Sequence, residues 1–412
     1  MIVIPGVMGS RLRGVNGGRE VWPGGVWNLV TGDRFGALAL QLDSAGGAAG
    51  PDALEPAGFF SEAFGSDYYG EIVRTLAGPG GYRCVPADAL TAESDCVLFA
   101  WDWRRDLVEA ASGLGAVIDR IRRVRGDPEQ KVDVVAHSAG GLVARYFVRY
   151  GGRDVLDRAD PEATIDTTAG QAVRRVILVG TPNYGSVSAL QRAIMGNDLG
   201  PRLATMPPEL LATMPSLYEL LPNPARTWMI GSRGERLDID LYDAETWRRY
   251  RWAVFDPAVR RRIARAAGTD AEAELARRER FFAQGLARGR RFHRALSAPV
   301  TTIPNQYIVF GGDCTLTPAR CLVETVDGQV RIRLRPEEVT NRVPGVDYER
   351  LMLEPGDGRV TKASLLGRDT LDPEAPEPGF FPVAYAVFIC REHAGLPSDV
   401  TFRDNLLNIL LY

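Results

Sequence analysis

The sequence predicts an α/β protein with a mostly parallel sheet wrapped by helices. Short apolar runs rich in β-branched residues alternate with longer segments of helical periodicity, a pattern typical of parallel sheets. One run, Val176–Val179, is apolar throughout, as expected for a strand buried on both faces of such a sheet. We expect flanking helices at Gly113–Arg125 and Ala139–Tyr150. The expected core strands are Met1–Ile4, Cys96–Ala100, Val132–Ala136, Val173–Val179, Gln306–Phe310 and Val383–Cys390.

The middle of the chain has a different composition. Strand-like runs are absent between about residues 186 and 299, where Leu, Met, Arg and Trp are frequent and prolines interrupt the chain. Its segment Met206–Leu221 is apolar enough to line a lipid-sized cleft or to pack this region against the core. We therefore expect a helical cap at 186–299, inserted between two core parts at 1–185 (with a lid loop at about 15–50) and 300–412.

Two further elements are expected around the end of this region. The charged segment Ala271–Arg294 predicts an amphipathic helix whose polar face is solvated. The dipeptide Asp327-Gly328 is typical of a tight hairpin turn, and it predicts a β-hairpin over Leu322–Leu334.

Composition and charge exclude several classes of function. The chain of 412 residues is 45% hydrophobic and has a formal net charge of −3, so no basic surface favours nucleic acid. No run approaches the roughly 18 apolar residues that a membrane span requires, which leaves at most a peripheral membrane contact, around Trp22 and Trp27. The N-terminus enters a strand without a signal-peptide pattern, so we expect a cytoplasmic location.

The cysteines carry no metal-binding pattern. They form no Cys-x-x-Cys pair and no Cys/His spacing typical of a metal site, so we expect neither a metal nor another cofactor. Without an export signal, five free thiols are the expectation. In an exported protein, Cys84 with Cys96, or Cys314 with Cys321, would be candidates for local disulfides. The five cysteines are Cys84, Cys96, Cys314, Cys321 and Cys390.

The clearest functional signal lies around Ser138. An apolar run enters a His-Ser-Ala-Gly turn, and an amphipathic segment follows it. This is the layout of a nucleophile elbow, in which a serine on a sharp strand-to-helix turn exposes its hydroxyl. Glycine is usual two residues before and after that serine because the backbones approach closely; here these positions are Ala136 and Gly140. The pattern predicts that Ser138 is the nucleophile of a serine hydrolase with an α/β-hydrolase fold.

A nucleophilic serine needs a general base, usually a histidine held by a carboxylate. In α/β-hydrolases the chain order is serine, acid, histidine. The chain has three histidines. His137 adjoins Ser138 and should point away from its hydroxyl, which suggests a structural role, and His293 lies within the expected cap helix. His393 follows the last expected strand on a loop, the usual place of the base, so we assign the base to His393.

Two carboxylates between the serine and the histidine fit the acid. Asp357 lies between two glycines in a tight turn, from which its carboxylate can be presented freely. Asp313 follows the strand that ends at Phe310 and is the alternative. Position along the chain favours Asp357 but leaves both open.

An acyl-transfer enzyme also needs N–H donors for the oxyanion of its tetrahedral intermediate. The N–H of Ala139, next to the nucleophile, is one expected donor. The second should come from the Pro-Gly loop after the first strand, through Val7 or, alternatively, Met8. Candidates for the wall of an acyl pocket, or simply for core packing, are Trp101, Trp103 and Tyr184.

Seven short motifs, taken in order, resemble the lecithin:cholesterol acyltransferase family of α/β-hydrolases. Each is modestly specific alone, but together they extend from the first strand to the last helix. The motifs are Ile4–Leu12, Ala100–Arg104, Ala136–Tyr146, Gly180–Ser186, Pro215–Pro222, Gly356–Val360 and the loop of His393.

The resemblance implies roles that the residues alone leave open. It favours Asp357 as the acid, because the family keeps its acid in a Gly-Asp-Gly motif, and it implies an oxyanion N–H in the Pro-Gly loop. It also implies that 186–299 contains the family's lid and cap. Two positions depart from the family pattern: Arg359 stands where threonine is more usual, and Val7 where lipid-acting members often carry a polar residue.

The expected activity is cleavage of a carboxylic ester, of a lipid or of another alcohol, through an acyl-enzyme. One alternative is an acyltransferase that passes the acyl group to an alcohol instead of water. A more remote alternative is a binding protein that retains an inactive hydrolase fold.

Overall fold

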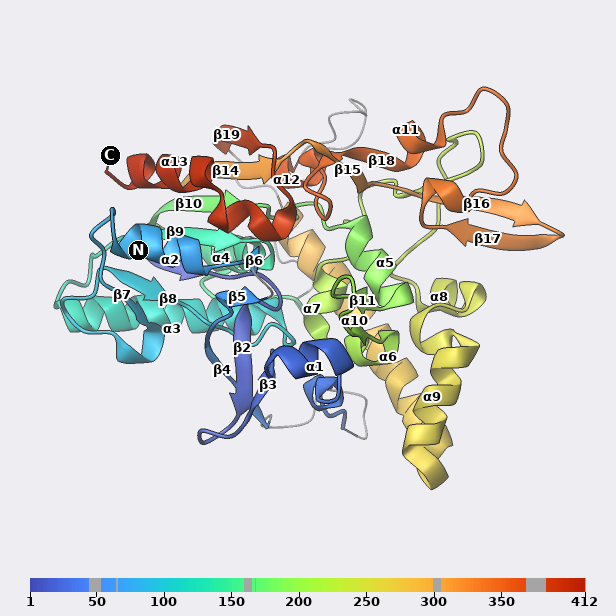
Figure 1. Ribbon diagram of the computed structural model, residues 1–412, viewed down its shortest axis with the longest axis horizontal. Coiled ribbons are helices and arrows are strands. Elements are labelled where there is room, and N and C mark those ends of the chain that lie inside the picture. The colour runs from blue at the N-terminus through green and yellow to red at the C-terminus, as the bar shows by residue number, and fades with distance from the viewer. Residues whose placement is uncertain are drawn as a thin grey trace.

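A parallel sheet of seven strands forms the centre of the molecule (Figure 1). The computed structural model describes residues 1–43, 53–63, 66–158, 165–166, 168–298, 305–367 and 383–411. All six strands expected from the sequence are in this sheet, and a seventh, β7, was not predicted. In spatial order the strands are β19 (Val383–Ile389), β14 (Gln306–Gly312), β10 (Val173–Val179), β9 (Val132–His137), β1 (Ile2–Ile4), β8 (Cys96–Leu98) and β7 (Cys84–Pro86).

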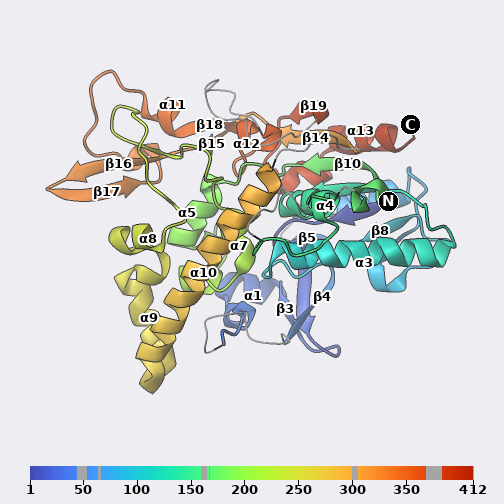
Figure 2. The same ribbon diagram turned by 180° about the vertical axis from the view of Figure 1, so that it is seen from behind.

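Helices cover both faces of the sheet, as Figures 1 and 2 show from opposite sides. Successive residues of a strand point to opposite faces, so Ile2 and Ile4 of β1 pack in one core and Val3 in the other. The first core includes α3 (Leu107–Arg125) and α4 (Ala139–Tyr150), and the second includes α2 (Gly70–Ala77) and α13 (Val400–Leu411). The predicted fold class, an α/β-hydrolase fold with a mostly parallel sheet wrapped by helices, is confirmed.

The two predicted core helices form, with one difference at a boundary. Helix α4 has the predicted limits, whereas α3 begins at Leu107, six residues before the predicted Gly113. The earlier start follows from an N-cap, because the side chain of Asp106 accepts a hydrogen bond from the N–H of Val108 (2.8 Å).

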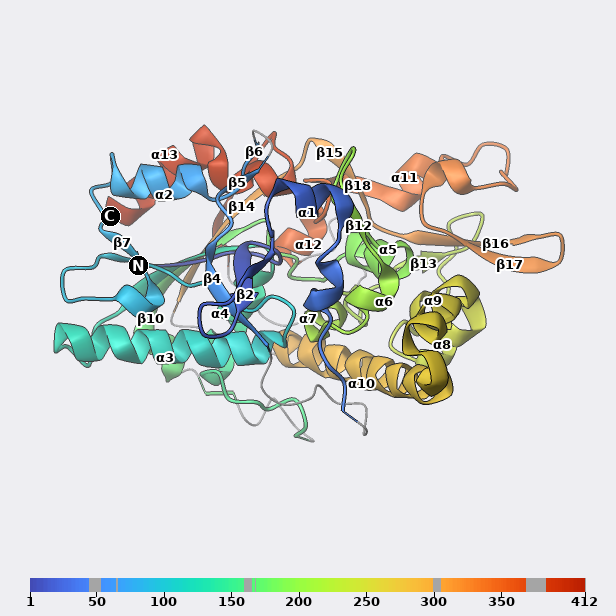
Figure 3. The same ribbon diagram turned by 60° about the horizontal axis from the view of Figure 1, so that its bottom comes forward.

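The region after β10 is mainly helical, and Figure 3 shows it beside the sheet. The charged helix with the expected solvated face is α10 (Ala271–Ser297), and it also buries a face made of Phe281, Phe282, Leu286 and Phe292. Three two-residue strands were not expected: β11 (Asn197–Asp198), β12 (Thr205–Met206) and β13 (Met229–Ile230). The helices are α5 (Val187–Met195), α6 (Pro208–Leu211), α7 (Pro215–Glu219), α8 (Ala244–Tyr250), α9 (Pro257–Ala267) and α10 (Ala271–Ser297).

The division of the chain into two core parts and a cap stays a prediction, and its boundary at 299–300 lies outside the described residues. The expected lid loop contains α1 (Val26–Thr31) and the 3₁₀ helix η1 (Phe35–Leu38), while its last residues, from 44 on, also lie outside the described part. The loop also contains β3 (Glu20–Trp22), which pairs with β2 (Ser10–Gly14) in a small sheet that includes β4 (Leu54–Phe59).

The predicted hairpin is present as β16 (Cys321–Val326) and β17 (Gln329–Arg333). Asp327 and Gly328 both have positive φ, of 51° and 73°, as a tight two-residue hairpin turn requires. The remaining elements are short: β5 (Glu62–Ala63), β6 (Ser66–Asp67), β15 (Thr315–Pro318), β18 (Leu353–Gly356), α11 (Tyr348–Met352), α12 (Lys362–Leu366), and the 3₁₀ helices η2 (Ala87–Ala89), η4 (Ala169–Ala172), η5 (Ala253–Phe255), η6 (Gly268–Asp270), η7 (Pro336–Glu338) and η8 (His393–Ser398).

The cysteines correct one expectation, because the predicted five free thiols are not found. Cys84 and Cys96 form a disulfide between neighbouring strands β7 and β8, as the alternative pairing foresaw. Cys314 pairs with Cys390 instead of Cys321, and Cys321 is a buried free thiol. Cys314 and Cys390 are adjacent because they follow the carboxyl ends of the neighbouring parallel strands β14 and β19.

Candidate active site

Ser138 lies at a sharp turn between strand β9 and helix α4. Its backbone has φ 53° and ψ −127°, a region that a residue with a side chain rarely adopts and that is typical of a nucleophile elbow. Gly140 explains part of the motif, because a Cβ there would lie 2.7 Å from the carbonyl oxygen of Pro5. The turn therefore depends on a close approach between α4 and the end of β1.

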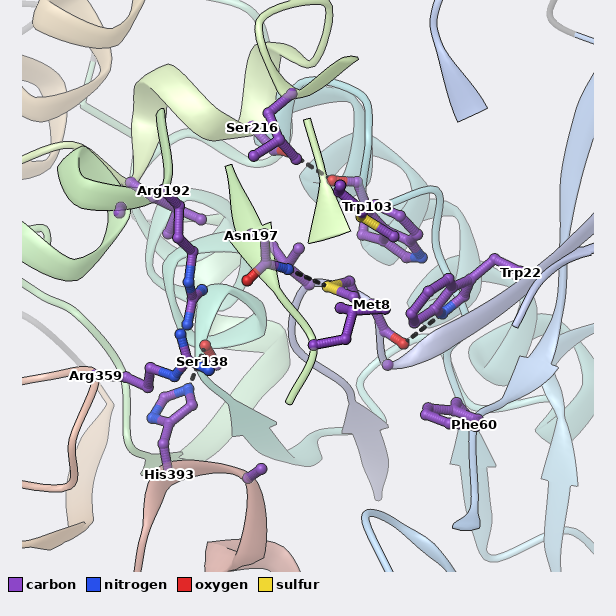
Figure 4. Close-up of a pocket in the computed structure, with 18 of the residues that line it drawn as sticks. Met8, Trp22, Phe60, Trp103, Ser138, Arg192, Asn197, Ser216, Arg359 and His393 are labelled. Carbon is purple, nitrogen blue, oxygen red and sulfur yellow. Dashed lines mark hydrogen bonds between the residues drawn. The ribbon is translucent and has the colours of Figure 1, made fainter. Parts of the chain in front are cut away.

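Three of the predicted side chains meet at this turn. His393 Nε2 lies 2.9 Å from Ser138 Oγ, and His393 Nδ1 lies 2.8 Å from Asp357 Oδ2. Their segments come from three places in the chain: the elbow, the turn after β18, and η8 beyond the last strand of the sheet. Figure 4 shows the dashed contact between Ser138 and His393 at the bottom of a cavity. The arrangement can carry a proton from the serine hydroxyl to the imidazole, with the carboxylate holding the ring.

The Asp357 carboxylate is buried, with an exposed fraction of 2%. Its Oδ1 accepts hydrogen bonds from the N–H groups of Arg359 (3.0 Å) and Val360 (2.7 Å), which leaves Oδ2 facing His393. The main chain adds a further link, since the N–H of His393 donates to the carbonyl oxygen of Asp357 (2.9 Å). This carboxylate is therefore oriented by the backbone on both sides.

The other acid and the other histidine considered for the triad, Asp313 and His293, lie outside the site. Asp313 forms an ion pair with Lys362, whose Nζ is 3.1 Å from Asp313 Oδ2. His293 is buried within α10, where burial lowers its pKa to about 4. Neither side chain lines the cavity that contains Ser138.

The loop after β1 lies directly against the serine. A Cβ on Gly6 would be 2.7 Å from the Cβ of Ser138, so only glycine allows this approach. Val7 and Met8 line the cavity beside Ser138, and within the described residues no acceptor engages the N–H of Val7, Met8 or Ala139. Val7 and Met8, the two alternatives for the second oxyanion donor, thus both line the cavity of Ser138, and Ala139 follows the serine directly.

A chain of hydrogen bonds runs behind the site, and it includes a residue that the sequence did not indicate. The N–H of Gly6 donates to Tyr69 Oη (2.8 Å), and Tyr69 Oη lies 2.6 Å from His137 Nδ1. His137 Nε2 lies 3.1 Å from the carbonyl oxygen of His393. Because Tyr69 accepts from Gly6, its hydroxyl donates to His137, which in turn donates to His393.

His137 therefore points away from the Ser138 hydroxyl, as the sequence suggested, yet it connects two loops of the site. Burial, and next the neighbouring His393, hold the pKa of His137 well below its usual range, so the ring is neutral at physiological pH. Tyr69 precedes α2 without any motif, and nothing in its local sequence marks its position here.

The cavity above Ser138 has a volume of about 320 Å³ and is mostly apolar. Trp103 contributes to its wall, whereas Trp101 and Tyr184 are outside its lining: Trp101 donates to the carbonyl oxygen of Pro5 (2.9 Å), and Tyr184 lies in a separate small hollow. The segment expected to line a cleft or to pack the cap contributes several side chains to this wall, namely Met206, Leu211, Met214, Leu217 and Leu220.

Two kinds of feature are absent from the described part of the chain. No group of His, Cys, Asp and Glu side chains there could hold a metal ion. Within the same residues, no helix has both the length and the apolar character needed to cross a bilayer.

Comparison with solved structures supports the fold. A chain in the crystal structure of the Tle4–Tli4 complex aligns with 100% of this chain and 97% of its own, with a TM-score of 0.58 and 15% sequence identity. At that identity the likeness concerns the fold alone.

Two further structures align more loosely and carry no argument. They are the Bacillus licheniformis lipase BlEst2 in its propeptide form (13% identity, 76% of this chain and 43% of the other, TM-score 0.32), and EstA from Clostridium botulinum (11% identity, 99% and 85%, TM-score 0.35).

Comparison with sequences gives one family. No curated protein matches the chain. The model of the lecithin:cholesterol acyltransferase family matches residues 86–236, which include the elbow and the segment that lines the cavity. This match supports an enzyme that hydrolyses or transfers the acyl groups of lipid esters. The chain is therefore similar to the lecithin:cholesterol acyltransferase family, as its motifs predicted.

Proposed function

We propose that the protein is a serine hydrolase that cleaves carboxylic esters of lipid type through an acyl-enzyme on Ser138. The observation that carries the proposal is the continuous contact from Ser138 Oγ through His393 to the buried Asp357. A neutral serine hydroxyl is a weak nucleophile, and an oriented imidazole within hydrogen-bond reach removes that limitation.

The first half-reaction forms the acyl-enzyme. Ser138 Oγ attacks the ester carbonyl carbon while His393 Nε2 takes the hydroxyl proton. The tetrahedral intermediate then collapses: the bond to the alcohol oxygen breaks, and His393 gives its proton to the departing alcohol. Asp357 keeps the ring oriented and stabilises the imidazolium that forms between these two steps.

The second half-reaction releases the acid. A water molecule loses a proton to His393 and attacks the acyl carbon, and the Ser138 oxygen leaves with that proton. In both half-reactions the N–H groups of Ala139 and of Val7, or alternatively Met8, would donate to the oxyanion. The unengaged amides beside the serine support this assignment.

Hydrolysis of p-nitrophenyl esters from acetate to palmitate tests the proposal. Ser138→Ala should lower kcat by at least about 10⁴-fold, because a triad acts as a unit. Ser112→Ala, at an exposed serine on α3, is the matched control and should retain wild-type rates. Equal turnover by wild type and Ser138→Ala would overturn the serine mechanism, and the preferred chain length would report the size of the cavity.

The family match favours a second candidate, transfer of the acyl group to an alcohol. The same acyl-enzyme serves both reactions, and they differ only in whether water or an alcohol reaches it. Product analysis in the presence of a competing alcohol separates them: a new ester indicates transfer, and free fatty acid alone indicates hydrolysis.

Two observations bear on where the enzyme works. The two disulfides favour an oxidising compartment over the expected cytoplasm, because disulfides persist where thiols are not kept reduced. Of the two tryptophans considered for membrane contact, Trp22 is buried in the core, whereas 73% of Trp27 is exposed. Leu29 on the same helix lines the cavity, so a peripheral lipid contact through Trp27 would lie next to the site.

A further inference from the structure

Two arginines line the mostly apolar cavity. Arg192 extends from α5 and Arg359 from the turn that follows Asp357, and both line the cavity together with Ser138 and His393. Figure 4 shows both side chains directed toward Ser138 and His393. Neither guanidinium forms an ion pair within the described residues, and the buried Nε of Arg192 has no hydrogen-bond partner there.

Several buried or half-buried arginines elsewhere in the chain lie against carboxylates. Arg104 lies 2.6 Å from Asp102, Arg175 lies 3.0 Å from Asp133, and Arg226 lies 3.0 Å from Glu354. Arg192 is half-buried and Arg359 is exposed, so both can meet a ligand in the cavity. A bound anion would supply an acceptor for the buried Nε of Arg192 and a negative charge for both guanidinium groups.

Hydrogen bonds connect the two segments that carry Arg192 and Arg359. Ser186 caps the N-terminus of α5, and its hydroxyl donates to the carbonyl oxygen of Arg359 (2.5 Å). The N–H of Arg359 donates to the carboxylate of Asp357 (3.0 Å). The backbone positions that carry Arg192 and Arg359 are therefore fixed relative to Asp357. Because Asp357 orients His393, they are also fixed relative to Ser138.

Among the charged side chains that line the cavity, the two arginines outnumber the carboxylates. Asp198 is the one carboxylate in the described lining; it is exposed, and it accepts a hydrogen bond from the N–H of Gly200 (2.9 Å). Glu392 attracts Arg359 electrostatically from outside the lining. The cavity is therefore lined by two guanidinium groups and by one exposed carboxylate, that of Asp198.

Resting on the function proposed above, we infer that the enzyme selects acyl esters of an anionic phosphate-bearing alcohol. The substrate class is a glycerophospholipid with a net negative headgroup, such as phosphatidic acid, in preference to a zwitterionic or neutral ester. The apolar wall takes the acyl chain, and Arg192 and Arg359 bind the phosphate, for which the planar guanidinium has matching donor geometry. A choline headgroup would bring a second cation toward the same two arginines.

The test compares dihexanoyl phosphatidic acid with dihexanoyl phosphatidylcholine and with p-nitrophenyl butyrate. The lipids are kept below their critical micelle concentrations, so that the charge of a lipid surface plays no part. The variants are Arg192→Gln, Arg359→Gln and the double variant. Arg265→Gln, at an exposed arginine of α9 remote from the cavity lining, is the matched control.

We expect wild type and Arg265→Gln to prefer phosphatidic acid over phosphatidylcholine by about tenfold to a hundredfold in kcat/KM, the range for charge-assisted hydrogen bonds. The double variant should lose this preference but still turn over p-nitrophenyl butyrate, which shows that it is folded, and Arg265→Gln should keep the wild-type kcat on that ester. No preference in wild type, or a preference that survives in the double variant, would overturn the inference.

A binding measurement separates this inference from the proposed function. Calorimetry with dihexyl ether analogues of the same two lipids, which lack a cleavable ester, reports the headgroup preference without turnover. If Ser138→Ala retains esterase activity, the serine mechanism fails, yet tighter binding of the anionic analogue, lost in the double variant, still supports the arginine site. Equal binding of both analogues by wild type overturns that site even if the esterase activity is established.

Discussion

The floor and the wall of the cavity are built in different ways. The floor consists of the elbow, the Pro5–Gly9 loop, Asp357 and His393, and it lies at the carboxyl ends of parallel strands, where such sheets place their sites. The side chains of Asp357, His393 and His137 all have partners between 2.6 and 3.1 Å away. The wall includes side chains from α1, α5 and the Met206–Leu221 segment and is mostly apolar; Arg192 on α5 is part of it, and Arg359 lines the cavity from the turn after Asp357.

We therefore expect the floor to determine the rate of the reaction and the wall to determine which ester binds. Positions in the floor depend on close backbone approaches, such as that of Gly6 to Ser138, so a substitution there disturbs the proposed chemistry. Side chains in the wall can be exchanged without moving the strands, so substitutions there should alter which ester enters. Variants of the floor should therefore change kcat on every ester, and variants of the wall should change the ranking of esters.

The largest effect distinguishes the two candidate acids of the floor. Asp357→Asn should lower kcat on p-nitrophenyl butyrate by about 10³- to 10⁴-fold, because the amide no longer stabilises the imidazolium or holds the required tautomer. Asp313→Asn removes only the ion pair with Lys362 and is the matched control, with activity near wild type. The reverse ranking of these two variants would assign the acid to Asp313.

A smaller effect is expected behind the floor. Tyr69→Phe removes the hydroxyl that joins the N–H of Gly6 to His137, and should lower kcat by about tenfold, the cost of one or two hydrogen bonds. KM should change little, because phenylalanine keeps the ring that lines the cavity, and the lost hydroxyl contacts Gly6 and His137. Tyr82→Phe, at a tyrosine outside the cavity lining, should leave kcat unchanged. Equal kcat in Tyr69→Phe and wild type would show that this hydrogen-bond chain has no effect on the reaction.

The smallest effect concerns the outer side of the wall. Trp27→Ala should lower hydrolysis of phospholipid in vesicles by about threefold to tenfold, because an exposed apolar side chain on α1 can insert at a lipid interface. The same variant should hydrolyse p-nitrophenyl butyrate at the wild-type rate, since Trp27 does not line the cavity. Sedimentation with vesicles gives an independent reading, and undiminished vesicle binding by the variant would exclude Trp27 as the contact.

Several features of the site were predictable because local sequence determines them. The elbow is a local turn, so its apolar run, its small residues and its serine are all visible in the motif around Ser138. With three histidines in the chain and a known order of triad residues, His393 was the natural base. Central strands such as β9 and β10 were found for a similar reason, because burial on both faces requires nearly continuous apolar runs.

Other features depend on which distant segments become neighbours. Cys314 and Cys390 are 76 residues apart and pair because β14 and β19 are adjacent, whereas spacing alone suggested Cys321. Tyr69 is 68 residues from His137 and carries no motif. The choice between Asp357 and Asp313 stayed open on chain position, and in the structure it is Asp357 that lies against His393 while Asp313 lies against Lys362.

The sequence by itself thus determined the α/β architecture, the elbow and the predicted base, because apolar periodicity and turn chemistry act within a few residues. Only the tertiary structure decided the disulfide partners, the link through Tyr69 and the convergence of Arg192 with Arg359. Those contacts arise where segments far apart in the chain meet at the carboxyl edge of one sheet. Which segments meet there depends on the order of the strands in the sheet, and no local sequence pattern encodes that order.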